Sequence, residues 1–81
     1  MKFQVEHTDT FGGEANYCWV RRYIIEADDS ISDLALVRRA KQYCGLSGCR
    51  SKTENWGDML VIKPAKIHQI IFVTPIEEEG T

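Results

Sequence analysis

Four aromatic and basic residues alternate in one short stretch and are the residues whose types could bind a ligand. They are Tyr17, Trp19, Arg21 and Tyr23, within "NYCWVRRYIIEADDSIS", residues 16–32. Side chains two residues apart share one face of a β-strand. Aromatic rings can stack on nucleic-acid bases while arginine neutralises phosphate, and the same residue types dominate protein–protein interfaces. The stretch therefore predicts a partner-binding surface, for another protein or for single-stranded RNA or DNA.

The cysteines and histidines could in principle bind a metal. Cys44 and Cys49 are separated by four residues, and Cys18 with His7 or His68 could complete four ligands. The sequence lacks the paired CxxC that is usual for such a site. Cys44 also belongs to an apolar pattern, where a cysteine behaves as a small buried hydrophobe. We expect no metal and no cofactor.

Catalytic chemistry has little support in the sequence. His7 or His68 could assist a cysteine nucleophile, but no third residue that would orient the histidine is apparent. The pair Gly12-Gly13 lacks the Lys-Ser/Thr that follows in a phosphate-binding loop. A chain of 81 residues also limits the depth of a pocket. We expect a non-enzymatic protein.

Composition indicates one small folded domain. The chain has 81 residues, 43% hydrophobic and 27% charged, which is ordinary for a globular domain. No segment reaches the roughly 18 apolar residues of a membrane span, and no signal peptide is apparent. We expect a cytoplasmic location, no membrane partner and three reduced cysteines. Residues 1–76 are expected to form the domain, and 77–81 a disordered acidic tail.

Charge is distributed unevenly around a net value of −2. Residues 17–52 contain seven Lys or Arg and four Asp or Glu, whereas the remainder contains three and eight. A basic middle with an acidic end is compatible with a charged partner. The balance is far from the strongly basic composition of a dedicated DNA-binding protein.

The first half of the chain predicts two strands and a helix. Residues 2–8 alternate apolar and polar, residues 8–13 read as a turn, and residues 15–27 form a second strand with room for a bulge at Arg21-Arg22. Ser30 is expected to cap a helix over residues 31–44, and Gly45 to end it. The helix is expected to bury a stripe of Leu34, Val37, Ala40 and Cys44.

The second half predicts another hairpin. Residues 59–62 and 67–74 are apolar runs joined by a turn at residues 63–66, and Pro75 closes the second run. Residues 45–58 read as a loop that could contain a short strand at 50–53. The fold class is therefore α+β, with an antiparallel sheet of about four strands and one helix on one face, in the order β-β-α-β-β.

One helix can cover only one face of the sheet. Because Cys18, Val20 and Ile24 are compact, we expect them to face the helix and the aromatic-basic set to face away. The later strands are apolar on both sides, so the open face is expected to bind a second copy or another protein. Alternatively, the 45–58 loop, anchored by Trp56, covers this face.

The segment "YIIEADDSISDLALVRRAK", residues 23–41, resembles small α+β proteins of phages and mobile elements. In these a strand ends in a similar acidic corner and leads into a basic helix. Several anti-CRISPR inhibitors look like this. The resemblance implies a non-catalytic inhibitor that binds a host protein, and it assigns no role to any individual residue.

Overall fold

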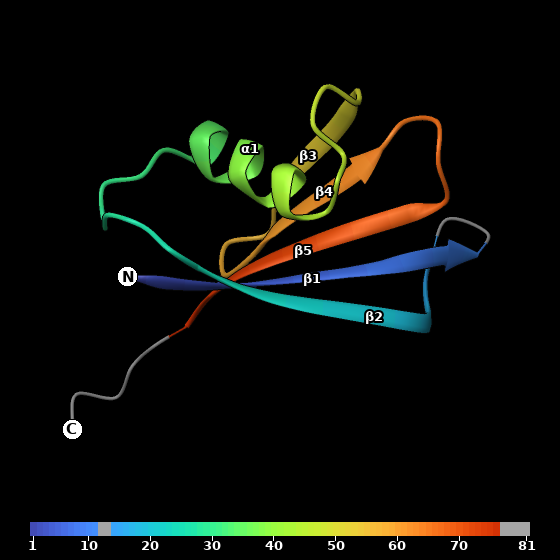
Figure 1. The fold of residues 1–81 in the computed structure, drawn as a ribbon, viewed down its shortest axis with the longest axis horizontal. Helices are drawn as coiled ribbons and strands as arrows, with labels where there is room; N and C mark the ends of the chain where they lie inside the picture. The colour runs from blue at the N-terminus through green and yellow to red at the C-terminus, as the bar shows by residue number, and fades with distance from the viewer. Residues whose placement is uncertain (12–13, 77–81) are drawn as a thin grey trace.

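A computed structural model describes residues 1–11 and 14–76 of the chain (Figure 1). The predicted α+β class is confirmed, with one helix and a five-stranded antiparallel sheet in the order β2-β1-β5-β4-β3. The extra strand lies in the region where a short strand was expected. The elements are β1 Lys2–Phe11, β2 Glu14–Glu26, α1 Asp33–Tyr43, β3 Ser51–Asn55, β4 Leu60–Pro64 and β5 Gln69–Ile76. Two expected features, the Gly12-Gly13 part of the turn and the tail at 77–81, lie outside the described residues.

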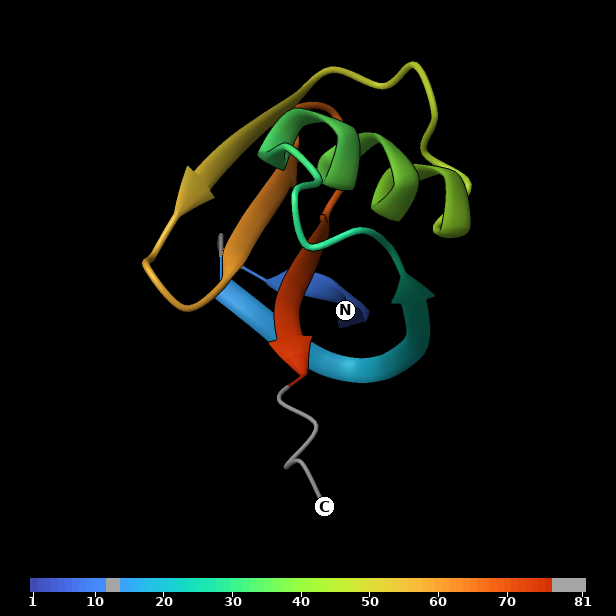
Figure 2. The same ribbon diagram turned by 90° about the vertical axis from the view of Figure 1, so that its left-hand side faces the viewer.

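The sheet curves around the helix. Figure 2 shows the strands bending from β3 to β2, with α1 on the concave side. Side chains from both layers form one core beneath the helix. No helix in the described part of the chain has the length and apolar character that a bilayer crossing needs. The core consists of Phe3, Val5, Ile25, Leu36, Val37, Ala40, Leu46, Leu60, Ile62, Ile71 and Val73.

The ends of α1 follow from its capping residues. Ser32, not Ser30, is the N-cap, and its Oγ accepts a hydrogen bond from the Ala35 amide at 3.2 Å. At the other end Gly45 has φ +72°, as predicted for a glycine after the last turn. The amides of Gly45 and Leu46 donate to the carbonyls of Gln42 and Lys41, so these two carbonyls of the last turn are satisfied.

The buried stripe of α1 differs from the prediction. Leu36, Val37 and Ala40 are buried, Cys44 is half-buried, and Leu34 is exposed. Each residue advances by about 100° around a helix, so Leu34 lies about 200° from Leu36 and points away from the sheet. Its neighbour Leu36 takes the place in the core that the spacing assigned to Leu34.

The β1–β2 pairing corrects the prediction about which face of β2 is buried. Phe3 is opposite Ile25 and Val5 is opposite Tyr23, so Tyr23 and Ile25 lie on the helix side of the sheet. Ile25 is completely buried, whereas Ile24 is 54% exposed. The expectation that Ile24 faces the helix is wrong. Both residues are isoleucine, so their types cannot distinguish the two faces, and the partner strand decides.

The strand boundaries at the two prolines also differ from the predicted turns. Pro64 ends β4, and Pro75 lies within β5 opposite Phe3. The β4–β5 pairing ends at the Leu60–Val73 pair, so β4 does not reach the level of Pro75. The missing N–H of Pro75 therefore costs no hydrogen bond between these two strands.

Candidate functional site

The four predicted binding residues do not share a face. Tyr17 lies on the sheet face that α1 leaves uncovered, together with side chains from β1, β4 and β5. Trp19, Arg21 and Tyr23 lie on the helix side, as the pairing of His7 with Arg21 and Val5 with Tyr23 requires. The predicted continuous aromatic-basic surface is therefore wrong. A change in the backbone between Tyr17 and Trp19 separates the two groups.

A β-bulge produces this change. Thr8 pairs with Val20 and Thr10 with Ala15, so residues 16–19 of β2 stand opposite the single residue Asp9. Tyr17 lies inside the bulge with φ +57°, a conformation that non-glycine residues seldom adopt. The sequence had suggested a bulge at Arg21-Arg22, but both residues pair regularly with β1.

Asp9 and Thr8 hold the bulge in place. The Asp9 carboxylate accepts hydrogen bonds from the Asn16 side chain at 3.1 Å and from the Cys18 amide at 3.0 Å. The Thr8 hydroxyl donates to the Trp19 carbonyl at 2.6 Å. Desolvation of Asp9 favours a higher pKa, but these hydrogen bonds to the charged form outweigh it and lower the pKa. Side-chain polar groups of β1 therefore fix the direction in which Tyr17 projects.

Trp19 belongs to the margin of the core. Its ring meets the buried imidazole of His7 edge-on at 4.9 Å, and the Arg21 guanidinium lies 5.6 Å from the centre of the Trp19 ring. The Nε2 atom of His7 is 2.7 Å from the side-chain oxygen of Gln69. His7 is 3% exposed and so belongs to the core, but its Nδ1 atom has no hydrogen-bond partner among the described residues. Trp19, at 36% exposed, therefore covers a buried polar group.

Tyr23 also packs against the helix. Its ring lies 5.7 Å from the ring of Tyr43 in α1, in a tilted arrangement, and it packs against the core cluster. Such aromatic pairs stabilise packing beyond the area that they bury. Trp19 and Tyr23 are thus fixed by intramolecular contacts.

A groove occupies the uncovered face of the sheet. It has a volume of about 430 Å³. Two aromatic side chains contribute to it while remaining largely exposed, Tyr17 at 54% and Trp56 at 58%. The alternative that Trp56 seals this face is therefore not what the structure shows. The groove is lined by Glu6, Glu14, Ala15, Tyr17, Trp56, Met59, Lys63, Ile70, Phe72 and Thr74.

The sequence indicated an open apolar face and correctly assigned Tyr17 to it, but it also assigned Trp19, Arg21 and Tyr23, which lie on the helix side. Phe72 and Ile70 alternate along β5 with the core residues Ile71 and Val73. Because both alternating sets are apolar, only the strand register identifies Phe72 as a groove residue. The signal for Trp56 is local: it follows β3 in a Gly-Asp turn, where a large aromatic residue has no neighbouring strand to cover it.

The charges around the groove are mostly paired. Lys63 forms an ion pair with Glu54 at 2.8 Å, and this hydrogen-bonded contact lowers the pKa of Glu54. Glu6 lies 3.5 Å from Arg22 of β2. Glu14 is exposed at the start of β2. Lys63 and Glu6 are therefore both paired, and the exposed carboxylate of Glu14 gives the groove a mildly acidic character.

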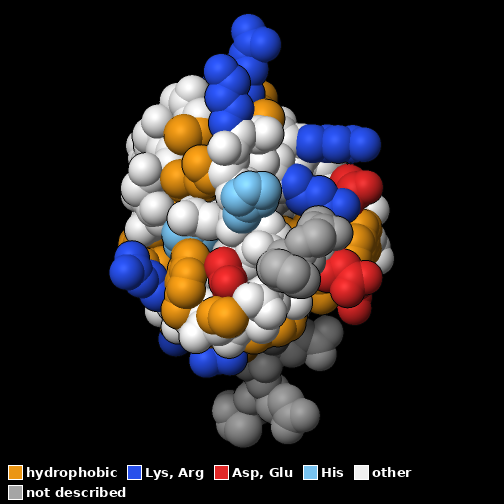
Figure 3. Space-filling model, turned by 90° about the vertical axis from the view of Figure 1, so that its right-hand side faces the viewer, with side chains coloured by type: hydrophobic (Ala, Val, Ile, Leu, Met, Phe, Trp, Pro, Cys, Tyr) orange, Lys and Arg blue, Asp and Glu red, His pale blue; other side chains and the backbone are white. Residues whose placement is uncertain are grey.

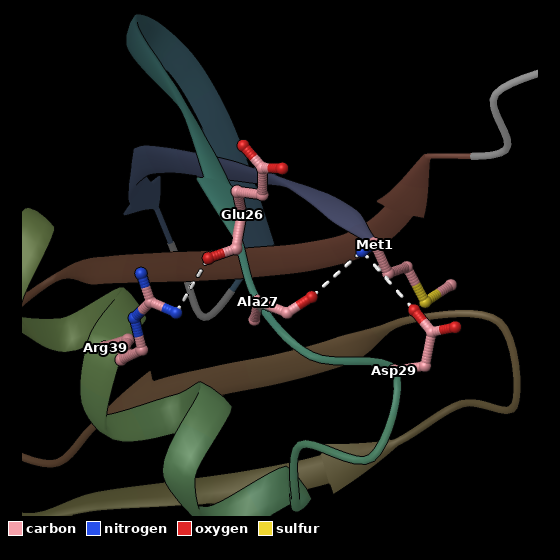
Figure 4. Close-up of polar contacts among 5 residues, drawn as sticks. All are labelled: Met1, Glu26, Ala27, Asp29 and Arg39. Atoms are coloured by element: carbon pink, nitrogen blue, oxygen red, sulfur yellow. Dashed lines mark hydrogen bonds and ion pairs between the residues drawn. The ribbon is translucent and has the colours of Figure 1, made fainter.

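A second hollow lies where β2 leads into α1. It has a volume of about 760 Å³ and is lined by backbone and acidic residues of the connecting loop. Figure 4 shows the contacts that shape it: the Met1 amine donates to the Ala27 carbonyl at 2.9 Å and lies 3.3 Å from Asp29. Arg39 donates to the Glu26 carbonyl at 2.9 Å. These contacts fasten the loop, and they bring no reactive side chains together.

The end of the molecule near the β1–β2 connection has a mixed surface. Figure 3 shows histidine, apolar, basic and acidic side chains interspersed there, without one continuous basic patch. Cys18 and Cys49 are exposed, in contrast to the expectation that Cys18 is buried, and all three cysteines are free thiols. Within residues 1–11 and 14–76, no group of three or more His, Cys, Asp or Glu side chains could hold a metal ion.

The three thiols are expected to differ in reactivity. Burial raises the pKa of Cys44 to about 11 from an ordinary 9.0, although Arg21 opposes the shift. At pH 8 the thiolate fraction of Cys44 is then lower by about a hundredfold than without the shift. Iodoacetamide should alkylate Cys18 and Cys49 well before Cys44, as peptide mass spectrometry would show. In urea-unfolded protein the three rates should converge, and equal rates in the folded protein would contradict the prediction.

No family model matches the chain, and comparisons with curated proteins and with solved structures find no significant similarity. We therefore infer its function from the surface of the molecule.

Proposed function

We propose that this chain is a non-enzymatic protein-binding module that takes an apolar segment of a partner protein into the groove on the uncovered face of its sheet. The observation that carries the proposal is the pair of exposed aromatic side chains, Tyr17 and Trp56, beside the apolar residues Ile70 and Phe72. Large rings next to a concave apolar surface are typical anchors of a protein interface. Inhibition of a host protein, as the anti-CRISPR resemblance implies, is one form of this function.

The chemistry of the groove indicates the partner segment. An apolar side chain of the partner would cover the half-buried Phe72 and the exposed rings of Tyr17 and Trp56, and the burial of this surface would supply the main favourable term. Because Glu6 pairs with Arg22, it is the exposed carboxylate of Glu14 that favours a basic residue next to that apolar anchor. Because Lys63 already pairs with Glu54, an acidic residue of the partner would bind Lys63 less favourably than it would bind an unpaired lysine.

Single-stranded nucleic-acid binding is the alternative that the aromatic-basic stretch suggested. In the folded chain, the side chains of this stretch are less suited to binding a nucleic acid than their spacing in the sequence implied. Arg21 lies over the ring of Trp19, so that ring face is occupied, and Tyr23 is engaged with Tyr43. A base would have to displace these contacts before it could stack.

A peptide selection tests the proposal. Random twelve-residue peptides displayed on phage would be selected on the immobilised protein, with counter-selection on Trp56→Ala. We expect enriched peptides to contain a large apolar residue beside Lys or Arg, and Trp56→Ala to weaken their binding by about tenfold or more, as for an interface anchor. Amide chemical shifts should change around Phe72 and Met59.

Leu34→Ala is the matched control, because Leu34 is an exposed apolar residue on the helix side. It should leave the affinity of the selected peptides unchanged. Peptides that bind Trp56→Ala and the unmodified protein equally well would overturn the proposal. So would a mixed single-stranded oligonucleotide that shifts the amides of residues 17–23 at low salt and releases at high salt, since this result supports nucleic-acid binding.

A further inference from the structure

The second half of β2, beyond the bulge, has a regular outer strand edge. β2 and β3 are the two edge strands of the sheet. β3 has only five residues, and a very short edge strand is one of the ways in which proteins protect a sheet edge from pairing. β2 pairs without interruption with β1 from Val20 to Glu26, and Figure 1 shows β2 as the outermost strand on its side. Such an edge can accept another strand.

The hydrogen bonds at the end of β2 show which residues face outward. Ala27 and Met1 exchange two hydrogen bonds, each 2.9 Å long. In an antiparallel ladder, bonded and non-bonded pairs alternate, so Tyr23 and Ile25 bond to β1. Arg22, Ile24 and Glu26 then direct their backbone N–H and C=O groups away from β1. The Glu26 carbonyl accepts its bond from Arg39, which confirms this direction (Figure 4).

The outward-facing residues of β2 are self-complementary. If two β2 strands pair antiparallel about a two-fold axis at Ile24, Ile24 meets Ile24 of the second copy. In the same register Arg22 stands opposite Glu26 of the second copy, and Glu26 opposite its Arg22. Opposite charges directly across a ladder stabilise it, whereas like charges destabilise it. The register that places Arg22 opposite itself is therefore disfavoured.

The neighbouring strand extends the charge match. Glu6 of β1 is already 3.5 Å from Arg22, and Lys2 is opposite Glu26 in the β1–β2 ladder. A row of alternating charge would then cross the joined edge. It would consist of Glu6 and Arg22 of one copy, followed by Glu26 and Lys2 of the second copy. The row lies on the same face as Ile24, whose side chain is 54% exposed in the single chain.

We propose that two copies of this chain associate through the outer edges of β2, which join their sheets into one continuous antiparallel sheet with the axis at Ile24. The Glu26 carbonyl can accept both the Arg39 bond and the new backbone bond, because it has two lone pairs. The axis is perpendicular to the sheet, so both helices lie on one face and both grooves on the other. The dimer would therefore present two equivalent grooves to a partner.

Charge reversal tests the pairing. Sedimentation velocity over a range of protein concentrations should show a dimer for the unmodified chain. Arg22→Glu and Glu26→Arg should each weaken dimerisation by about tenfold or more, because both symmetry-related pairs become repulsive. An equimolar mixture of the two variants should dimerise, because each strand then faces an oppositely charged one. Lys52→Glu, on the other edge strand, should behave as the unmodified chain.

Amide hydrogen exchange provides a second measurement that needs no variant. The amides of Arg22, Ile24 and Glu26 should exchange fast in dilute protein and slowly in concentrated protein, whereas Tyr23 and Ile25 stay protected at both. A chain that is monomeric at all concentrations would overturn the proposal. The proposal would also be overturned if folded Arg22→Glu or Glu26→Arg dimerised as well as the unmodified chain, or if the equimolar mixture of the two variants stayed monomeric. The dimer proposal and the groove proposal can fail independently. If Arg22→Glu is monomeric but still binds the selected peptides, the groove proposal holds whether or not the unmodified chain dimerises.

Discussion

Ile25→Ala is expected to lower the free energy of unfolding by about 2–5 kcal/mol, as for a buried isoleucine whose removal leaves a cavity. Ile25 is completely buried and packs within the core cluster under α1. The cluster includes residues from four strands and the helix, so it cannot collapse easily into the space. Urea unfolding followed by far-ultraviolet circular dichroism would measure the change.

Ile24→Ala is the matched control for this substitution. The residue type and the change are the same, but the Ile24 side chain is 54% exposed on the opposite face. We expect a change within about 0.5 kcal/mol in dilute, monomeric protein. Equal losses for the two variants would show that the strand register described above is wrong. A larger loss for Ile24 would reverse the assignment of the two faces.

Trp19→Ala is expected to cost about 2 kcal/mol of stability, less than the roughly 3–5 kcal/mol of a fully buried tryptophan. The ring is 36% exposed, but it packs edge-on against His7 and beneath Arg21. Its removal exposes the imidazole and leaves the guanidinium without its aromatic contact. Because the substitution removes a fluorophore, circular dichroism is again the suitable measurement.

Trp56→Ala is the natural comparison for Trp19. Trp56 is 58% exposed in the groove, so we expect its loss to change stability by no more than about 0.5 kcal/mol. The sequence predicted instead that Trp19 lies on the uncovered face and binds a partner, which implies that its loss would leave the fold intact. If Trp19→Ala retains full stability but abolishes partner binding, that sequence-based prediction is right and the core role described here is wrong.

The sequence by itself determined the local elements that depend on short-range chemistry. Gly45 ends the helix because only a residue that tolerates a positive φ fits there. The alternation of Phe3, Val5 and His7 predicted a half-buried strand, and all three side chains are buried. These features need no information from distant parts of the chain. The α+β class followed from their order along the chain.

Only the tertiary structure decided which face each β2 residue occupies. Alternation assigns residues to two sets, but it cannot say which set is buried when both contain apolar side chains, as at Ile24 and Ile25. Pairing with Val5 and Phe3 made that choice. The bulge at Asp9 then turned Tyr17 away from Trp19, through hydrogen bonds from Asn16 and Cys18 to the Asp9 carboxylate that the alternating pattern does not predict. The candidate groove therefore depends on strand register, which long-range packing sets.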